Sequence, residues 1–217
     1  AQDVSNAVYA LGLLSYKHRG FLNAVCAHVP ACMAEFKPQS VSNTVYALGV
    51  LAYRHDGFLR AVCTQMPVRL AEFKAQEISN AIYALGLLAY KHDDFLNSLC
   101  AQVSTRLGEF STQGLSNSVY ALALLAHRHE GFLRAACDGA VSHGSDFTAQ
   151  GISNMVYAFG ILSYRHEEFL RRVCIHAASH SAEFTPQGLS NVVCGVTVSF
   201  LARHRVARAN TMARKLP

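Results

Sequence analysis

Apolar residues recur along this chain with the spacing of helices that pack on two sides. In the stretch that begins near residue 38, Val41, Val45 and Leu48 share one helical face, because they lie three or four positions apart. Tyr46 and Val50 lie on a second face. A helix with two apolar faces is typical of one that is sandwiched between neighbours.

A second helix is expected from about residue 56 to about residue 70. Asp56 would lie in its first turn, where the helix dipole favours a negative charge. Phe58, Leu59 and Val62 would form its buried face. No run of strictly alternating apolar and polar residues suggests a β-strand.

This two-helix pattern repeats with a period of 37 residues. The dipeptide Ser-Asn marks each copy, at residues 5–6, 42–43, 79–80, 116–117, 153–154 and 190–191. The copies begin near residues 1, 38, 75, 112, 149 and 186. One helical pair cannot bury its own apolar faces, whereas a stack of pairs can. The sequence therefore predicts an all-α fold: an α-solenoid over residues 1–201, followed by a basic tail over residues 202–217.

Two residue types predict details of the first helix in each copy. Ser111, Thr148 and Thr185 stand just before it, where a hydroxyl caps the first turn. Gly49 lies inside it, although glycine costs about 1 kcal/mol relative to alanine in a helix. We expect this glycine to lie where another backbone comes close. Its counterparts are Gly12, Gly86 and Gly160.

Composition and charge exclude several classes of protein. The chain has 217 residues, of which 51% are hydrophobic and 15% charged, so it is not a disordered chain. No apolar run approaches the roughly 20 residues of a membrane span. The net charge is +5, but residues 1–183 sum to zero. The excess comes from Arg203, Arg205, Arg208, Arg214 and Lys215.

The cysteines are expected to be reduced, small apolar residues. Five of the seven recur at the 37-residue period, at Cys26, Cys63, Cys100, Cys137 and Cys174. Each ends an apolar helical face, so all five are predicted to be buried. Adjacent copies would hold them too far apart for a disulfide. No C-x-x-C spacing indicates zinc, and no metal, cofactor or catalytic motif is predicted.

The motif of the copies resembles a known group of repeats. The segment F-T-P-Q-G-L-S-N at residues 184–191, and the V-Y-A-L-x-x-L that follows Ser-Asn in earlier copies, resemble octotricopeptide and heptatricopeptide repeats. Those repeats form α-solenoids in algal and protist organelle proteins. The resemblance implies binding of organellar RNA, with a role in RNA stability, processing or translation, and a mitochondrial or chloroplast location. Some members are components of organellar ribosomes.

Candidate base-contacting positions lie on the first helix of each copy. Repeat proteins that recognise one base per repeat do so with two or three side chains of each repeat. The positions three before and one after each marker Asn vary between copies, and they share one helical face with it. These two positions hold Asp3, Ala7, Ser40, Thr44, Glu77, Ala81, Gly114, Ser118, Gly151 and Met155. The Asn column comprises Asn6, Asn43, Asn80, Asn117 and Asn154. The alternative for the Asn column is a structural ladder, in which each amide bonds to the backbone of the next copy.

Candidate phosphate contacts lie at the turn after that helix. A basic residue followed by histidine recurs there, and a row of positive charges at repeat spacing could follow an RNA backbone. The row consists of Lys17, Arg54, Lys91, Arg128 and Arg165, followed by His18, His55, His92, His129 and His166. The alternative is a solvated turn in which histidine caps a helix end.

Two functions remain open from the sequence. One is single-stranded RNA binding in an organelle, which the basic row and the resemblance favour. The other is a protein-binding scaffold or a structural subunit of a larger assembly such as an organellar ribosome, which the neutral charge of residues 1–183 favours. Neither is an enzyme, and neither requires a small-molecule substrate or a membrane.

Overall fold

The computed structural model describes residues 2–143 and 147–198, and it is all-helical. Helix accounts for 81% of the structure, with no strand in the described ranges, which confirms the all-α prediction. The predicted tail over 202–217 lies outside the described residues. The odd-numbered helices are α1 (Gln2–Leu13), α3 (Pro38–Val50), α5 (Ala75–Leu87), α7 (Thr112–Leu124) and α9 (Ala149–Ile161). The even-numbered helices are α2 (Arg19–Cys32), α4 (Asp56–Val68), α6 (Asp93–Val103), α8 (Glu130–His143) and α10 (Glu167–Ser179). A further helix covers residues 186–198.

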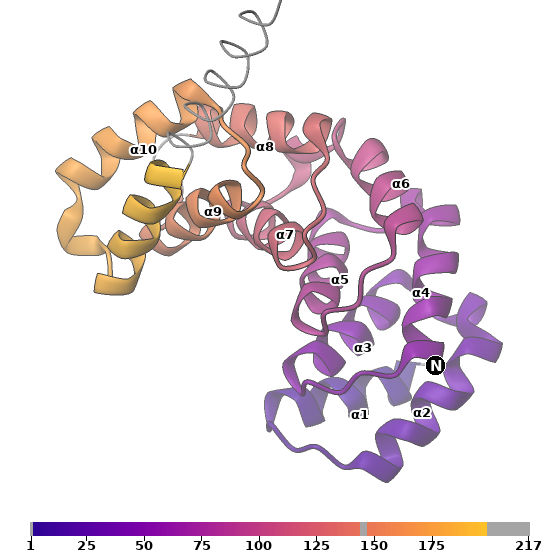
Figure 1. Ribbon diagram of the computed structural model, residues 1–217. Coiled ribbons are helices and arrows are strands. Elements are labelled where there is room, and N and C mark those ends of the chain that lie inside the picture. Colours follow the sequence, from indigo (N-terminus) through magenta and orange to yellow (C-terminus); the bar gives the residue numbers. More distant parts are fainter. Residues whose placement is uncertain (1, 144–146, 199–217) are drawn as a thin grey trace, which may run out of the picture.

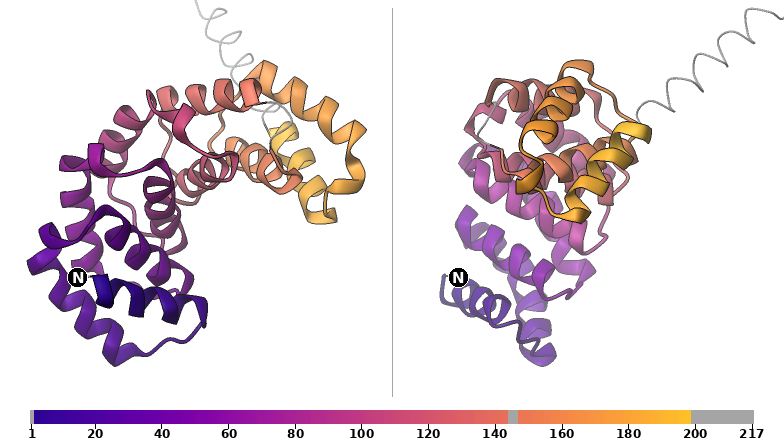
Figure 2. Two further views of the ribbon diagram at one scale, coloured as in Figure 1. Left: turned by 180° about the vertical axis from the view of Figure 1, so that it is seen from behind. Right: turned by 90° about the vertical axis from the view of Figure 1, so that its left-hand side faces the viewer.

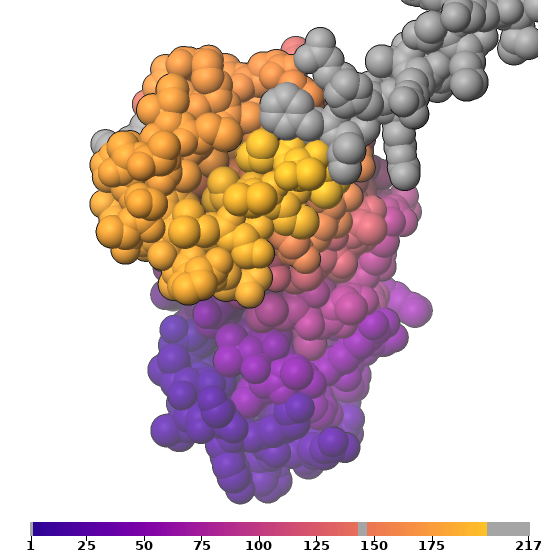
Figure 3. Space-filling model, turned by 60° about the vertical axis from the view of Figure 1, so that its left-hand side comes forward, coloured from indigo at the N-terminus to yellow at the C-terminus, as the bar shows by residue number. Residues whose placement is uncertain are grey.

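The helices form two layers that follow an arc. Each odd-numbered helix packs on the next odd-numbered one, from α1 through α9, and the even-numbered helices pack on one another in the same order. The odd-numbered helices lie on the inside of the arc and the even-numbered helices on the outside (Figures 1 and 2). In the space-filling view the chain runs in sequence order from the indigo end to the yellow end (Figure 3).

Close contacts between odd-numbered helices explain the direction of the curve. A Cβ atom added to Gly49 would lie 2.9 Å from Cα of Ala84 in the next copy, and Gly86 meets Ala121 in the same way. The prediction that these glycines lie against another backbone is confirmed. Contacts are more extensive along the inner layer than along the outer one. The inner helices therefore lie closer together, and the arc bends toward them.

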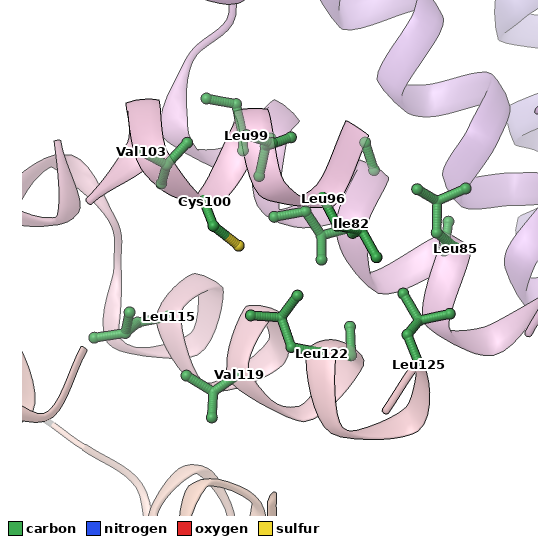
Figure 4. Packing of buried hydrophobic residues seen from close by; sticks show 14 of the residues in the cluster. Ile82, Leu85, Leu96, Leu99, Cys100, Val103, Leu115, Val119, Leu122 and Leu125 are labelled. Atoms are coloured by element: carbon green, nitrogen blue, oxygen red, sulfur yellow. The ribbon is translucent and has the colours of Figure 1, made fainter. Parts of the chain in front are cut away.

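The core lies between the two layers. Leu96 and Cys100 of α6 point toward the side chains of α7, among them Leu122 (Figure 4). All three side chains are fully buried. Each even-numbered helix from α4 to α8 also contributes one fully buried phenylalanine, at Phe58, Phe95 and Phe132. The apolar faces predicted from the sequence thus meet in one continuous core.

The prediction for the cysteines is correct for four of the five. Cys26, Cys63, Cys100 and Cys137 are buried and free, and burial raises the pKa of Cys26, Cys63 and Cys100 to about 12. Burial also raises the pKa of Cys137. Cys174, in contrast, is exposed, because the outer layer has no helix beyond α10 among the described residues.

Candidate functional site

Each of the inner helices α3, α5, α7 and α9 leaves mainly a single stripe of side chains accessible. In α3 this stripe consists of Gln39, Asn43, Tyr46 and Val50, spaced four, three and four residues apart along one face. Gln39 and Val50 are exposed, and Asn43 and Tyr46 are half-buried. All other residues of α3 are buried except Pro38 at its start, which is half-buried. We call this set the amide–tyrosine stripe.

The amide–tyrosine stripe recurs in the first five copies with little change, and the sixth copy keeps the glutamine and the asparagine but carries Cys194 in place of the tyrosine. The glutamines are Gln2, Gln39, Gln76, Gln113, Gln150 and Gln187. The tyrosines are Tyr9, Tyr46, Tyr83, Tyr120 and Tyr157, and all are half-buried. The aliphatic residues are Leu13, Val50, Leu87, Leu124 and Ile161, and all are exposed. The stripe is the accessible side of each inner helix, and the inner helices lie on the inside of the arc (Figure 2). We therefore infer that the stripes together form the surface there.

Neighbouring stripes lie side by side. The helices that carry them pack on one another, α3 on α5 and α5 on α7. Burial raises the pKa of Tyr83, and the charges of Tyr46 and Tyr120 raise it further. Within a stripe, the two amides can bond to each other: Gln2 Nε2 donates to Asn6 Oδ1 at 3.0 Å, and Gln187 Nε2 donates to Asn191 Oδ1 at 3.0 Å. The inner face is therefore a continuous surface of amide and phenol groups that carries almost no charge.

A polar cavity opens between two neighbouring stripes. It has a volume of about 260 Å³, lies between α7 and α9, and is lined by Gln113, Asn117, Gln150 and Asn154. Gly151 also lines it, at a position where the second and third copies carry Ser40 and Glu77. A Cβ atom added to Gly151 would lie 3.4 Å from Thr148 Oγ1 and 3.5 Å from Ser116 Oγ, two further residues of the lining.

The Asn column is accessible, and it does not form the structural ladder that was the alternative. Asn6 is exposed and the others are half-buried. In the first two copies the preceding serine makes the bond to the neighbouring copy: Ser5 Oγ donates to Ser40 O at 2.9 Å, and Ser42 Oγ donates to Glu77 O at 2.9 Å. The corresponding serines of the next three copies bond within their own helix. The amide groups of Asn43, Asn80, Asn117 and Asn154 thus remain candidates for ligand contact.

The variable positions require a correction. We expected them to contact bases, but most are buried between adjacent inner helices. Thr44 Oγ1 donates to Ser40 O at 2.8 Å within its own helix, and Ser118 Oγ donates to Gly114 O at 2.8 Å in the same way. The buried positions are Ser40, Thr44, Ala81, Gly114, Ser118, Gly151 and Met155. Glu77 is half-buried, and only Asp3 and Ala7 of the first copy are exposed. They vary because different small or compact side chains fill a helix–helix contact, and none of the buried ones offers surface to a base.

The basic row also has a structural role that the sequence left open. Arg54 Nη1 donates to Ala89 O at 3.1 Å, and Lys17 Nζ donates to Ala52 O at 3.1 Å. The acceptor residues Ala52 and Ala89 follow the end of an inner helix and have a left-handed backbone, with φ of 47° and 48°. Lys17 and Arg54 therefore each bind the end of the inner helix in the next copy, and we call this contact the clasp. Arg128 does the same with Ser163 O at 3.0 Å.

Carboxylates offset most of the charge in the basic row. Arg54 Nε lies 2.7 Å from Asp56 Oδ1, and Lys91 Nζ lies 3.2 Å from Asp93 Oδ1. Arg128 pairs with Glu130 and Arg165 with Glu167 in the same way. Exposed ion pairs of this kind contribute little stability, but they reduce the positive potential along this edge. The predicted phosphate-facing residues Arg54, Lys91, Arg128 and Arg165 thus each lie beside a carboxylate, which the sequence prediction did not take into account.

The histidines that follow the basic row cap the outer helices. Nδ1 of each histidine accepts a hydrogen bond from the backbone N–H three residues later, at 3.1 to 3.3 Å. The cap requires the tautomer or protonation state in which Nδ1 has no hydrogen. This arrangement agrees with the alternative interpretation of the turn. The capping residues are His18, His55, His92, His129 and His166.

We expect replacement of His92 by alanine to lower the free energy of unfolding by about 1 kcal/mol, because the N–H of Phe95 loses its acceptor. The His92→Asn variant should keep most of the stability, since asparagine is a good N-cap residue. Urea unfolding followed by circular dichroism measures both. Equal losses in the two variants would show that the cap is not the source of the effect.

Within the described ranges, no three His, Cys, Asp or Glu side chains come together as a metal site would require. None of the described helices combines the length and apolar character needed to cross a membrane. In comparisons with known proteins, no family model matches the chain and no curated protein matches it.

Sequence reasoning missed the glutamines and tyrosines of the stripe. Both recur at the 37-residue period, so the signal was present in the sequence. An unchanging residue, however, fits packing as well as binding. Only the burial of their neighbours shows that these two columns face the inside of the arc.

Proposed function

We propose that the chain is an α-solenoid of 37-residue helical pairs that binds single-stranded RNA along the inside of its arc. The observation that carries this proposal is the amide–tyrosine stripe, which gives each copy two amides and one tyrosine on the inner face. The ordered packing of odd on odd and even on even helices supports the solenoid. The resemblance to organellar repeats supports RNA as the ligand.

The chemistry of the stripe suits unpaired bases. A half-buried tyrosine offers part of its ring as a stacking surface, and stacking of a base on an aromatic side chain is worth about 1–3 kcal/mol. Glutamine and asparagine each carry both donors and an acceptor, as base edges do. One base per copy would thus find a stacking surface and two hydrogen-bonding partners.

The charge distribution sets the expected mode of binding. Because carboxylates offset most of the basic row, few free cations remain to track phosphates. Binding would therefore rest on the bases, and affinity would fall only gently with salt. We assign no catalytic step and no cofactor, and we propose a role in RNA stability, processing or translation in a mitochondrion or chloroplast.

A second candidate function rests on the same charge balance. Neutral edges, together with the exposed aliphatic residues of the stripe, fit a protein partner better than a polyanion. On this alternative the chain is a protein-binding scaffold or a structural subunit of a larger assembly such as an organellar ribosome.

The test is binding of the purified chain to a pool of random single-stranded RNA, measured by fluorescence anisotropy at two salt concentrations. We expect the Tyr83→Ala variant with Tyr120→Ala to weaken binding by about 1–3 kcal/mol for each lost stacking contact. Tyr83→Phe with Tyr120→Phe should bind as the parent does, because the ring remains.

A matched control uses the same residue type on the two layers. Gln76→Ala with Gln113→Ala removes exposed amides from the inner stripe, and Gln65→Ala with Gln102→Ala removes exposed amides from α4 and α6 of the outer layer. Only the first pair should weaken RNA binding. If the parent binds no RNA at either salt concentration, RNA binding is excluded and the scaffold function replaces it.

A further inference from the structure

The accessible amide and tyrosine groups of the inner layer are the same in the second to fifth copies. The positions that differ between copies are buried from the second copy onward or, in the case of Glu77, folded back: Glu77 Oε2 accepts from the backbone N–H of Lys74 at 2.8 Å. Each stripe therefore presents a glutamine, an asparagine and a tyrosine at the same three places. From the second to the fifth copy the accessible polar and aromatic groups of the stripe are therefore the same, and the exposed differences are confined to the aliphatic residues Val50, Leu87, Leu124 and Ile161.

We infer that the inner face recognises a run of one repeated nucleotide rather than a mixed sequence. This inference rests on the proposed function. If one base occupies each copy, identical side chains at identical places must favour the same base at every step. A reader of mixed sequence would need accessible side chains that change from copy to copy, and those that change are buried.

The positions of the two amides in each copy indicate how a base would be recognised, namely by hydrogen bonds to its edge. The glutamine and the asparagine lie four residues apart on one helical face, so both amides can reach the edge of a single base. A side-chain amide bonds most readily to an edge that carries a donor and an acceptor side by side, as the N6 and N7 groups of adenine do. The Watson–Crick edge of each base also offers such a pair. The structure thus predicts one preferred base without fixing which of the four it is.

The cavity between α7 and α9 indicates where a base would enter. Its lining combines the two amides of one copy, Gln113 and Asn117, with the two amides of the next, Gln150 and Asn154. Its volume of about 260 Å³ leaves space for a planar group between the stripes. A base placed there would meet amides on both sides and no charged side chain among the lining residues.

The experiment compares homopolymers with a mixed sequence. Four RNA oligomers of about 12 nucleotides, each made of one base, and one oligomer of scrambled sequence are titrated against the whole chain by anisotropy. We expect one homopolymer to bind at least roughly tenfold more tightly than the scrambled oligomer. A scrambled oligomer that binds within that factor of the best homopolymer would overturn the inference and leave RNA binding itself intact.

A second measurement locates the recognition on the stripe. One central mismatch in the best homopolymer should weaken binding to the parent by roughly tenfold. In the double variant Gln76→Ala/Asn80→Ala, the mismatch should weaken binding less than it does in the parent when the mismatched base lies at the third copy. The double variant Gln65→Ala/Gln102→Ala should lose as much affinity from the mismatch as the parent does. Equal discrimination in both variants would remove the stripe as its source. Failure of every oligomer to bind would instead contradict the proposed function.

Discussion

Replacement of Gly86 by leucine is expected to lower the free energy of unfolding by roughly 3 kcal/mol, the upper end of the usual cost of overpacking. A Cβ at this position would already lie 2.9 Å from Cβ and 3.0 Å from Cα of Ala121. The remainder of a leucine side chain could fit only if α5 and α7 moved apart. Because the contact repeats along the inner layer, the movement would also disturb the neighbouring stripes.

The measurement is urea unfolding of the Gly86→Leu variant, with Leu87→Ala as its control. Leu87 is the next residue along the chain, but it is exposed on the inner face, so its loss should change stability by less than about 0.5 kcal/mol. An unchanged unfolding midpoint in Gly86→Leu would mean that the two helices do not approach as closely as described. The fourth copy carries Ala123 at this position, so Gly86→Ala should have an intermediate effect.

Removal of the Phe95 ring should cost about 3–5 kcal/mol, because it leaves a cavity between the layers. Phe95 is 1% exposed and is enclosed by the helices of its own and the adjacent copies. Phe21 occupies the same position in the first copy but is 37% exposed, since the described residues include no copy that packs on its other side.

This pair of positions provides a comparison within one molecule. Phe21→Ala should destabilise the chain much less than Phe95→Ala when both are measured by urea unfolding under the same conditions. The difference would report how much of the burial comes from the neighbouring copy rather than from the helical pair itself. Equal losses would contradict the described stacking of copies.

The period of 37 residues was sufficient to predict the helices and several of their details. Gly49 was expected against a neighbouring backbone, and Thr148 was expected as a helix cap; Gly151 N–H does donate to Thr148 Oγ1 at 3.1 Å. These features depend on local geometry, which the order of residues determines. Residues that fill the same local role in each copy are therefore visible in the sequence.

The candidate site was harder to predict, because it depends on how each helix is rotated against its neighbours. Thr44 and Asn43 are adjacent in the sequence, yet the first is buried between two helices and the second faces the inside of the arc. A period alone does not give that rotation. The neutralised basic row, in contrast, had a visible signal: an acidic residue such as Asp56 or Glu130 stands two positions after each arginine or lysine that it pairs with.

The clasps between copies all run in the same direction along the chain. Lys17 holds the carbonyl of Ala52, Arg54 holds that of Ala89, and Arg128 holds that of Ser163, so each clasp reaches from one copy to the copy that follows it. A protease or unfolding motor that removed copies from the N-terminal side would release the helix end of each next copy as it advanced. Removal from the C-terminal side would leave the helix ends at Ala52 and Ala89 held by Lys17 and Arg54 until those copies are themselves reached. The two ends of the arc are thus unequal in their resistance to unravelling, even though the copies between them are nearly identical.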